Sequence, residues 1–152
     1  LSPSSAASDV YKRQGYEFTP GKAAQLVEGT DVTIIACGAL VGPAVQAAKL
    51  LAEQNVKARV LNMASIKPID ADAIVKAAKE TGAIVTAEEH NIYGGLGAAV
   101  AEVVTEFAPV PVIRIGTKDT FGESGTPKEL MAKYGLTAED IVSAAKTAIE
   151  RK

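Results

Sequence analysis

The sequence contains one cysteine, one histidine and no tryptophan, and it lacks any long apolar or charged run. A lone cysteine cannot form an internal disulfide, which favours a reducing compartment, so we expect a cytoplasmic protein. No apolar stretch reaches the roughly 18 residues that a membrane-spanning helix needs, so we expect no membrane association. Because the formal net charge is only −2 and no basic run is present, we expect no nucleic acid among the partners.

The chain has enough residues for one hydrophobic core. It is 152 residues long and 47% hydrophobic, and a domain of that size buries about two thirds of the surface of its unfolded chain. Residues 1–15 are rich in Ser and Ala and show no apolar period, so we expect a non-native or disordered tail there, similar to adaptor-derived read-through. We expect residues 16–152 to form a single domain.

From residue 22 onward, short apolar runs alternate with segments of helical spacing. The runs predict strands at residues 22–27, 32–36, 56–63, 83–87 and 110–115. Residues 22–27 are expected to form an edge strand, and Pro111 favours an edge position for the last strand. Because helices separate the later strands, the sequence predicts a doubly wound α/β fold, a Rossmann-like, mostly parallel (mixed) sheet of about five strands with helices on both faces.

Helix positions follow from apolar spacing and from capping residues. The second helix is expected to begin after the N-cap residue Asp70 and to end at Gly82. Thr126 and Thr137 each open a capping box, and Gly135 ends the helix between them. The first helix carries four apolar residues on one face: Val41, Val45, Ala48 and Ala52.

The stretch AIVTAEEHNIYGGLGAAVAEVVTEF, residues 83–107, joins a buried strand almost directly to a helix. In open α/β sheets, ligands bind at the carboxyl ends of the strands, so function is sought at this junction. Its polar and glycine residues are the candidate interface or anion-site residues: Glu88, Glu89, His90, Tyr93, Gly94, Gly95 and Gly97.

Two interpretations of these glycines remain open. Amides at a helix N-terminus would suit a phosphate, whereas glycines also permit a tight turn and close packing of a helix on a sheet. His90, which follows two glutamates, suits either proton transfer or a structural or interface hydrogen bond. The glycine spacing is not that of a dinucleotide fingerprint, so NAD is not expected.

Other candidate chemistry is sparse. Cys37 follows a strand near a helix start, where the pKa of a thiol can fall, but no base is nearby in sequence, so a buried, inert cysteine is favoured. His90 has no second histidine to complete a ligand set, and no metal site is expected. Neither a nucleophile elbow nor a Walker loop is present, and no catalytic residue is assigned.

Four segments resemble the C-terminal domain of transketolase: EGTDVTIIACG, VKARVLNMASIKPID, EEHNIYGGLGAAVAEV and IGTKDTFGESGTPKELMAKYGLTAEDI. The resemblance runs from Tyr16 to the end of the chain. 1-Deoxyxylulose-5-phosphate synthase and the β subunits of 2-oxoacid dehydrogenases share this domain. The FGESG loop at residues 121–125, followed by Pro127 and Leu130, is most similar to transketolase.

The resemblance implies the C-terminal domain or section of a pentose phosphate pathway enzyme that transfers a two-carbon ketol unit between sugar phosphates, using thiamine diphosphate and Mg²⁺. In that family a Gly-Asp-Gly motif of another domain holds the diphosphate and the metal. This sequence has no such motif, so the chain alone is expected to bind neither and to be inactive. The expected partners are the cofactor-binding domains, in the same chain or a separate one, within a homodimer or hetero-assembly. The alternative is a free-standing anion- or nucleotide-binding module.

Within such an enzyme, we expect the turn between strand and helix to be a docking surface rather than a catalytic centre. Glu88, Glu89 and His90 at the strand end are expected to be solvated in the isolated domain. Ile92 and Tyr93 are expected to be exposed until a partner covers them. An aromatic residue beside glycines is typical of the core of an interface.

Overall fold

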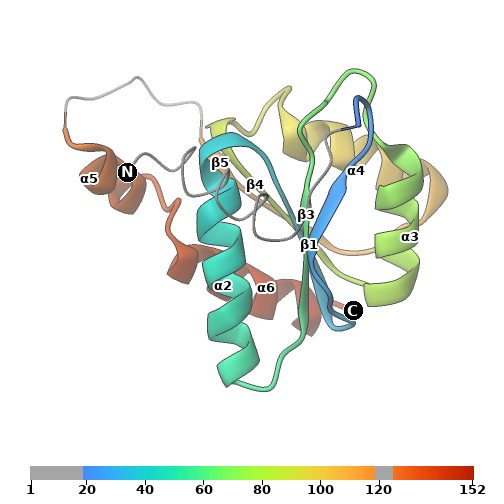
Figure 1. Ribbon diagram of the computed structural model, residues 1–152, viewed down its shortest axis with the longest axis horizontal. Coiled ribbons are helices and arrows are strands. Elements are labelled where there is room, and N and C mark those ends of the chain that lie inside the picture. The colour runs from blue at the N-terminus through green and yellow to red at the C-terminus, as the bar shows by residue number, and fades with distance from the viewer. Residues whose placement is uncertain (1–18, 119–124) are drawn as a thin grey trace.

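The structure is a computed structural model in which residues 19–118 and 125–152 are described (Figure 1). The tail expected at residues 1–15 and residues 119–124 of the loop after the last strand lie outside the described residues. In chain order the elements are β1 (Ala24–Val27), β2 (Val32–Ala36), the 3-10 helix η1 (Gly38–Leu40), α2 (Val41–Glu53), β3 (Ala58–Asn62), α3 (Ala71–Thr81), β4 (Ile84–Asn91), α4 (Leu96–Phe107), β5 (Val112–Thr117), α5 (Pro127–Lys133) and α6 (Ala138–Glu150).

The strands form one sheet in the order β1-β3-β2-β4-β5. β2, β3, β4 and β5 run parallel, and β1 pairs antiparallel with β3. β1 and β5 are the edge strands, as predicted, and the predicted mixed, doubly wound sheet is confirmed. The chain passes from β2 to β3 on one side and then crosses to β4 on the other, so its direction of winding reverses between β2 and β4.

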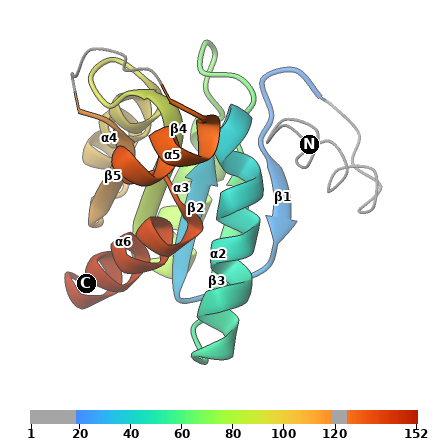
Figure 2. The ribbon, with the colours of Figure 1, turned by 90° about the vertical axis from the view of Figure 1, so that its left-hand side faces the viewer.

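Helices cover both faces of the sheet. α2 and α6 lie on one face, and α3 and α4 lie on the other (Figure 1), and Figure 2 shows α2 and α6 in front of the strands. Alternate strand residues point to opposite faces, so Ile34 joins the core beneath α2 and α6, whereas Ile35 joins the core beneath α3 and α4. On β4, Ile84 belongs to the second core, and the same alternation places Thr86 and Glu88 on the side of α3 and α4.

The predicted capping residues begin the helices. The side chain of Asp70 accepts hydrogen bonds from the amide of Ala73 at 3.1 Å and from the amide of Ala23 at 2.8 Å, so it also ties the residue before β1 to the start of α3. Thr126 and Thr137 both form complete capping boxes. The two glycines predicted to end helices have φ angles of 72° and 70°, in the left-handed region that glycine adopts without strain.

The structure differs from the prediction in α2, in β3 and in the turn after β2. Ala52 is exposed, because the buried face of α2 turns toward α6 and includes Leu51 in its place. β3 begins later than residue 56, because the amide of Val56 donates back to the carbonyl of Leu51 at 2.9 Å and the amide of Lys57 donates to Asp31 Oδ2 at 2.7 Å. The 3-10 helix η1 was not predicted.

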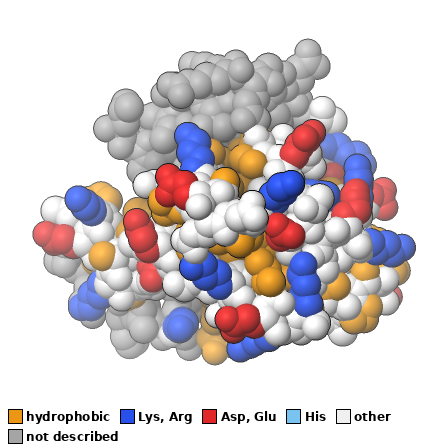
Figure 3. Space-filling view, turned by 90° about the horizontal axis from the view of Figure 1, so that it is seen from below, with side chains coloured by type: hydrophobic (Ala, Val, Ile, Leu, Met, Phe, Trp, Pro, Cys, Tyr) orange, Lys and Arg blue, Asp and Glu red, His pale blue; other side chains and the backbone are white. Residues whose placement is uncertain are grey.

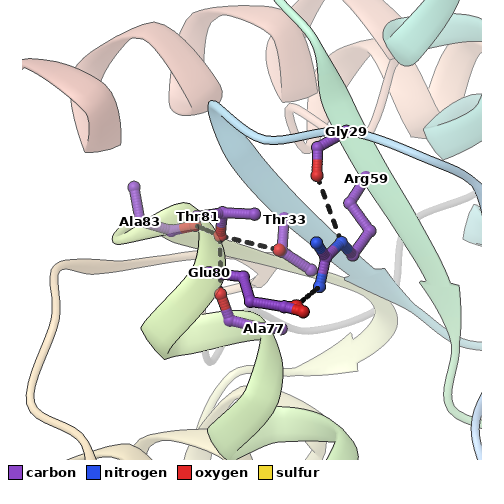
Figure 4. Close-up of polar contacts among 7 residues, drawn as sticks. All are labelled: Gly29, Thr33, Arg59, Ala77, Glu80, Thr81 and Ala83. Carbon is purple, nitrogen blue, oxygen red and sulfur yellow. Dashed lines mark hydrogen bonds and ion pairs between the residues drawn. The ribbon is translucent and has the colours of Figure 1, made fainter.

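Buried polar side chains join β2, β3 and α3 near the amino ends of the strands (Figure 4). The guanidinium of Arg59, which is 9% exposed, donates through Nε to the carbonyl of Gly29 at 3.2 Å and through Nη1 to Glu80 Oε2 at 3.4 Å. The hydroxyl groups of Thr33 and Thr81 lie 2.8 Å apart. Because each of these polar groups has a partner, this end of the sheet is closed by internal hydrogen bonds.

The face seen from below the view of Figure 1 carries Lys and Arg side chains interspersed with Asp and Glu side chains around hydrophobic ones (Figure 3). Mixed charge of this kind is typical of a solvated surface. No helix in the described part of the chain is long and apolar enough to cross a membrane. The expected cytoplasmic location and the expected lack of nucleic acid and membrane partners stay predictions.

Candidate functional site

The candidate site lies at the carboxyl edge of the sheet, where the direction of winding reverses between β2 and β4. Cys37 directly follows β2, and its amide donates to the carbonyl of Ala87 on β4 at 3.2 Å. η1 and α2 begin after β2, and α4 begins after β4, so helix N-termini meet at this edge. Crevices at such reversal points are the usual ligand sites of open α/β sheets.

The carboxylate of Glu88, a residue of β4, lies against the first turn of α4. The residue is 1% exposed, its Oε1 accepts from the amide of Leu96 at 2.8 Å, and its Oε2 accepts from the amide of Gly97 at 2.7 Å. The N-cap residue of α4, Gly95, offers no side chain for these bonds. The carboxylate of Glu88 therefore caps α4 from a neighbouring strand and meets the positive end of the helix dipole.

β4 is longer than predicted, because its pairing with β5 continues through an irregular segment to Asn91. Its register against β5 shifts between Ala87 and Asn91, where four steps along β4 correspond to two along β5. Extra residues of this kind bend a strand and re-aim its side chains. Gly116 of β5 lies opposite the irregular segment, and a Cβ there would be only 2.8 Å from the carbonyl oxygen of His90. Glycine at this position lets β4 pass close to β5 while Glu88 points under α4.

The expectation that Glu88 would be solvated is wrong, because its carboxylate is buried against the two amides. Those amides, of Leu96 and Gly97, are already engaged and do not face an outside anion. The other interpretation of the glycines, close packing of a helix on the sheet, describes Gly97. A Cβ at Gly97 would lie 2.8 Å from Thr86 Oγ1 and 2.9 Å from Arg114 Cδ, so only glycine lets α4 approach β4 and β5 this closely.

Glu89 and His90 are both exposed, so the structure separates these two candidate residues from the buried Glu88. The three consecutive residues therefore do not form one cluster. Among residues 19–118 and 125–152, no group of three or more His, Cys, Asp or Glu side chains is placed to hold a metal ion. Both interpretations of His90 stay predictions.

Tyr93 stands at the outside of the turn and is 63% exposed, as the sequence predicted. The adjacent Ile92 was also expected to be exposed, but it is 8% exposed, because the turn folds back and the amide of Ile92 donates to the carbonyl of Thr117 at 3.0 Å. Gly94, with a φ of 81°, then reverses the chain toward α4.

Arg114 of β5 supports this turn and was not among the predicted site residues. Its Nη1 donates to the carbonyl of Ile92 at 3.1 Å, and its Cζ lies 6.0 Å from the centre of the Tyr93 ring, at the outer limit of a cation–π contact. The signal for Arg114 was present as a single charged residue inside an otherwise apolar strand sequence, VIRIG.

The thiol of Cys37 is not activated. Burial, and secondly the negative charge of Glu88, raise the pKa of Cys37 from an ordinary value of 9.0 to about 11. The thiol is therefore protonated at neutral pH and is a poor nucleophile. The raised pKa agrees with an inert cysteine, but Cys37 is only partly buried rather than buried as predicted.

Comparison with known proteins gives matches over most of the chain. A family model described as transketolase, C-terminal domain, matches residues 21–141. An apulose-4-phosphate transketolase subunit of Phocaeicola vulgatus is 51% identical over 145 residues, which are 95% of this chain and 45% of that protein. The 6-deoxy-6-sulfo-D-fructose transketolase subunit of Clostridium sp. (strain MSTE9) is 51% identical over 136 residues, 90% of this chain and 42% of that protein.

A similar solved structure is described as a split gene transketolase, inactive beta4 tetramer. It matches with a TM-score of 0.87 and 51% identity, and the match covers 91% of this chain and 45% of that chain. This chain therefore spans less than half of the length of the relatives that it matches. The candidate site, residues 88–97, lies inside the region that the family model matches.

Proposed function

Because the chain belongs to the transketolase C-terminal domain family, we propose that it forms the C-terminal part of a transketolase-like enzyme, either as a domain or as a separate subunit. The observation that carries this proposal is the match of residues 21–141 to the family together with the short span of the chain relative to its relatives. The relative described as a split gene transketolase favours the separate subunit.

The reaction of the complete enzyme is then the transfer of a two-carbon ketol unit between sugar phosphates. Thiamine diphosphate is the cofactor that the family implies, and the N-terminus of α4 is the anion site that the sequence suggested for a phosphate. The amides there donate to Glu88, so these residues do not fit a diphosphate. We therefore assign the cofactor and its Mg²⁺ to the remainder of the enzyme and assign no chemical step to this chain.

The role of this chain is to complete and assemble the enzyme, and its docking surface is the turn of residues 88–97, called here the docking turn. Tyr93 is its anchor, because it presents 63% of its surface while the adjacent Ile92 is held by hydrogen bonds through both its amide and its carbonyl. Preorganised aromatic anchors lose little side-chain entropy on association. The occupant of this surface is the cofactor-binding part of the same enzyme, which corresponds to the part of the relatives that the match does not cover.

The first test is reconstitution. The full chain and the thiamine-binding part encoded upstream of it, or beside it, would be purified separately and mixed with thiamine diphosphate, Mg²⁺ and a ketose phosphate donor. We expect turnover only from the mixture. Saturable 1:1 binding of thiamine diphosphate to this chain alone in calorimetry, or turnover by the chain alone, would contradict the proposal. An upstream region of the 1-deoxyxylulose-5-phosphate synthase or 2-oxoacid dehydrogenase type would change the reaction, and an isolated start codon would favour a free-standing module.

The second test addresses the docking turn. Tyr93→Ala should weaken assembly by about 1–3 kcal/mol, the range of a moderate hot spot. Raising the protein concentration should restore much of the lost activity by mass action. Phe107→Ala is the matched control, since Phe107 is a comparably exposed aromatic residue, 59% exposed, at the other end of α4. If Phe107→Ala dissociates the assembly and Tyr93→Ala does not, the docking surface lies elsewhere.

A further inference from the structure

We propose that Glu88 is a built-in anion and a positioning residue: its carboxylate takes the place of a ligand at the reversal point of the sheet and holds the docking turn in the shape that presents Tyr93. The importance of that shape for assembly rests on the proposed function. The positioning itself rests only on the contacts of Glu88, Leu96 and Gly97.

The geometry of the carboxylate is that of a bound anion. Both of its oxygens accept hydrogen bonds from consecutive amides, at 2.8 Å from Leu96 and 2.7 Å from Gly97, at the N-terminus of a 12-residue helix. Burial to 1% exposure separates the group from solvent, so these two bonds are not exchanged for bonds to water. A charged acceptor with two amide donors makes a strong contact.

The same two hydrogen bonds close a loop in the chain. They connect the end of β4 to the start of α4 across residues 89–95, which contain Tyr93 and the permissive Gly94 and Gly95. Gly94 adopts a φ of 81°, and a Cβ built on it meets no atom within 4 Å, so local packing does not fix this glycine. The closure by Glu88 therefore limits the freedom of a segment whose own residues are permissive.

Arg114 ties the middle of the loop from the other side. Its Nη1 donates to the carbonyl of Ile92, and its stem lies against Gly97, which itself donates to Glu88. Glu88 thus fixes the two ends of the docking turn and Arg114 fixes its centre. Loss of the Glu88 carboxylate should free the ends while the contact at Ile92 remains.

The test uses the full chain with tryptophan as a reporter. The sequence has no tryptophan, so Tyr93→Trp introduces a single one in the docking turn. In this background, Glu88→Gln keeps the size of the side chain but replaces one acceptor oxygen with an NH2 group, which cannot accept from the backbone N–H that faces it. Glu88→Ala removes both acceptors. Glu89→Gln and Glu89→Ala are the matched controls, because Glu89 is the adjacent carboxylate and is exposed.

We expect both Glu88 variants to lower the fluorescence anisotropy of the reporter tryptophan and to lower the melting temperature by roughly 3–10 °C, with the far-ultraviolet circular dichroism of a folded protein. Sodium formate at about 0.1 M should restore the anisotropy and melting temperature of Glu88→Ala, because formate supplies the missing carboxylate to the two amides. Sodium chloride at the same ionic strength should restore less, and Glu88→Gln should not respond, because its side chain fills the position.

The proposal is overturned if the anisotropy of the reporter tryptophan is unchanged in Glu88→Gln, if the Glu89 variants show the same loss, or if formate has no more effect than chloride on Glu88→Ala. Should Glu88→Ala fail to fold even with formate, the decision rests on Glu88→Gln. These readouts need no partner, so they separate the two proposals. If Glu88→Gln loosens the turn in the Tyr93→Trp background and yet, with Tyr93 in place, assembles with wild-type affinity, positioning by Glu88 stands and docking through this turn is refuted.

Discussion

Gly97→Ala should destabilise the fold, although alanine is the better helix former. A Cβ at this position would lie 2.8 Å from Thr86 Oγ1 and 2.9 Å and 3.0 Å from Cδ and Cγ of Arg114. Ordinary contacts of a Cβ begin at 3.4 Å, so both neighbours would have to move by several tenths of an ångström. Thr86 is fully buried in a central strand, and Arg114 is held by the carbonyl of Ile92, so neither moves freely.

The size of the effect follows from two opposing terms. Forcing an extra methyl group into a packed core costs about 1–3 kcal/mol. Alanine regains at most about 1 kcal/mol over glycine in a helix interior, and less at Gly97, which is the second residue of α4. Displacing α4 would also lengthen the bond from the amide of Gly97 to Glu88. The net loss of stability should be about 1–2 kcal/mol, which lowers the melting temperature by roughly 2–8 °C for a chain of this size.

Thermal and urea unfolding, followed by circular dichroism, measure this loss. The double variant Gly97→Ala with Thr86→Ala identifies its cause, because removing Oγ1 takes away the closest of the three contacts. We expect the double variant to recover part of the stability, so that the two changes are not additive. If Gly97→Ala is as stable as the wild-type protein or more stable, the close approach of α4 to β4 and β5 does not exist and the reasoning fails.

Three further predictions concern other parts of the fold. Gly29→Ala should lower the free energy of unfolding by about 2–4 kcal/mol, measured with urea, because the new Cβ would lie 2.3 Å from the carbonyl carbon of Ala58. That carbon is a main-chain atom and cannot move away by a side-chain rotation. An unchanged urea midpoint would contradict this. Thr86→Val should leave stability unchanged or raise it by up to about 1 kcal/mol, because the buried Thr86 hydroxyl has no hydrogen-bond partner in the described part of the chain; a clear loss would reveal a partner. Cys37 should react with iodoacetamide at pH 8 about 100-fold more slowly than free cysteine, because its raised pKa leaves less thiolate. The free energy of unfolding should fall as the pH rises from 9.0 toward about 11, because the thiol ionises in the unfolded chain over this range but stays protonated in the folded protein. Labelling at the rate of free cysteine, or the same pH dependence in Cys37→Ser, would refute this.

The fold was predictable because its signals are local. The apolar runs placed every strand, the capping boxes of Thr126 and Thr137 placed the last two helices, and Pro111 correctly indicated an edge. Each of these signals depends on residues at most a few positions apart. The errors at Ala52 and at the start of β3 arose where α6 or Asp31, distant in sequence, decided the outcome.

The candidate site was predictable in position but not in detail. The junction at residues 83–107 and the exposure of Tyr93 followed from the sequence. The burial of Glu88 was missed although the alternation along β4 is readable from the sequence, whereas the irregular register of β4 against β5 and the space that Gly116 leaves there are not. Arg114 was missed for a related reason, since its contacts reach across from a different strand.

The alternation along β4 points to Glu88 as an inward residue. Strand residues two apart share a face, so Glu88 lies on the same side as Ile84 and Thr86, the side covered by α3 and α4. The helix that begins just beyond it has Gly95 at its N-cap, where no side chain can accept the first amides, and those amides need an acceptor when they are buried. A carboxylate at a strand end, on the face of a helix that lacks a capping side chain, supplies that acceptor. This combination is readable from sequence, and in this chain it distinguishes the inward Glu88 from the outward Glu89, which alternation places on the opposite side of the strand.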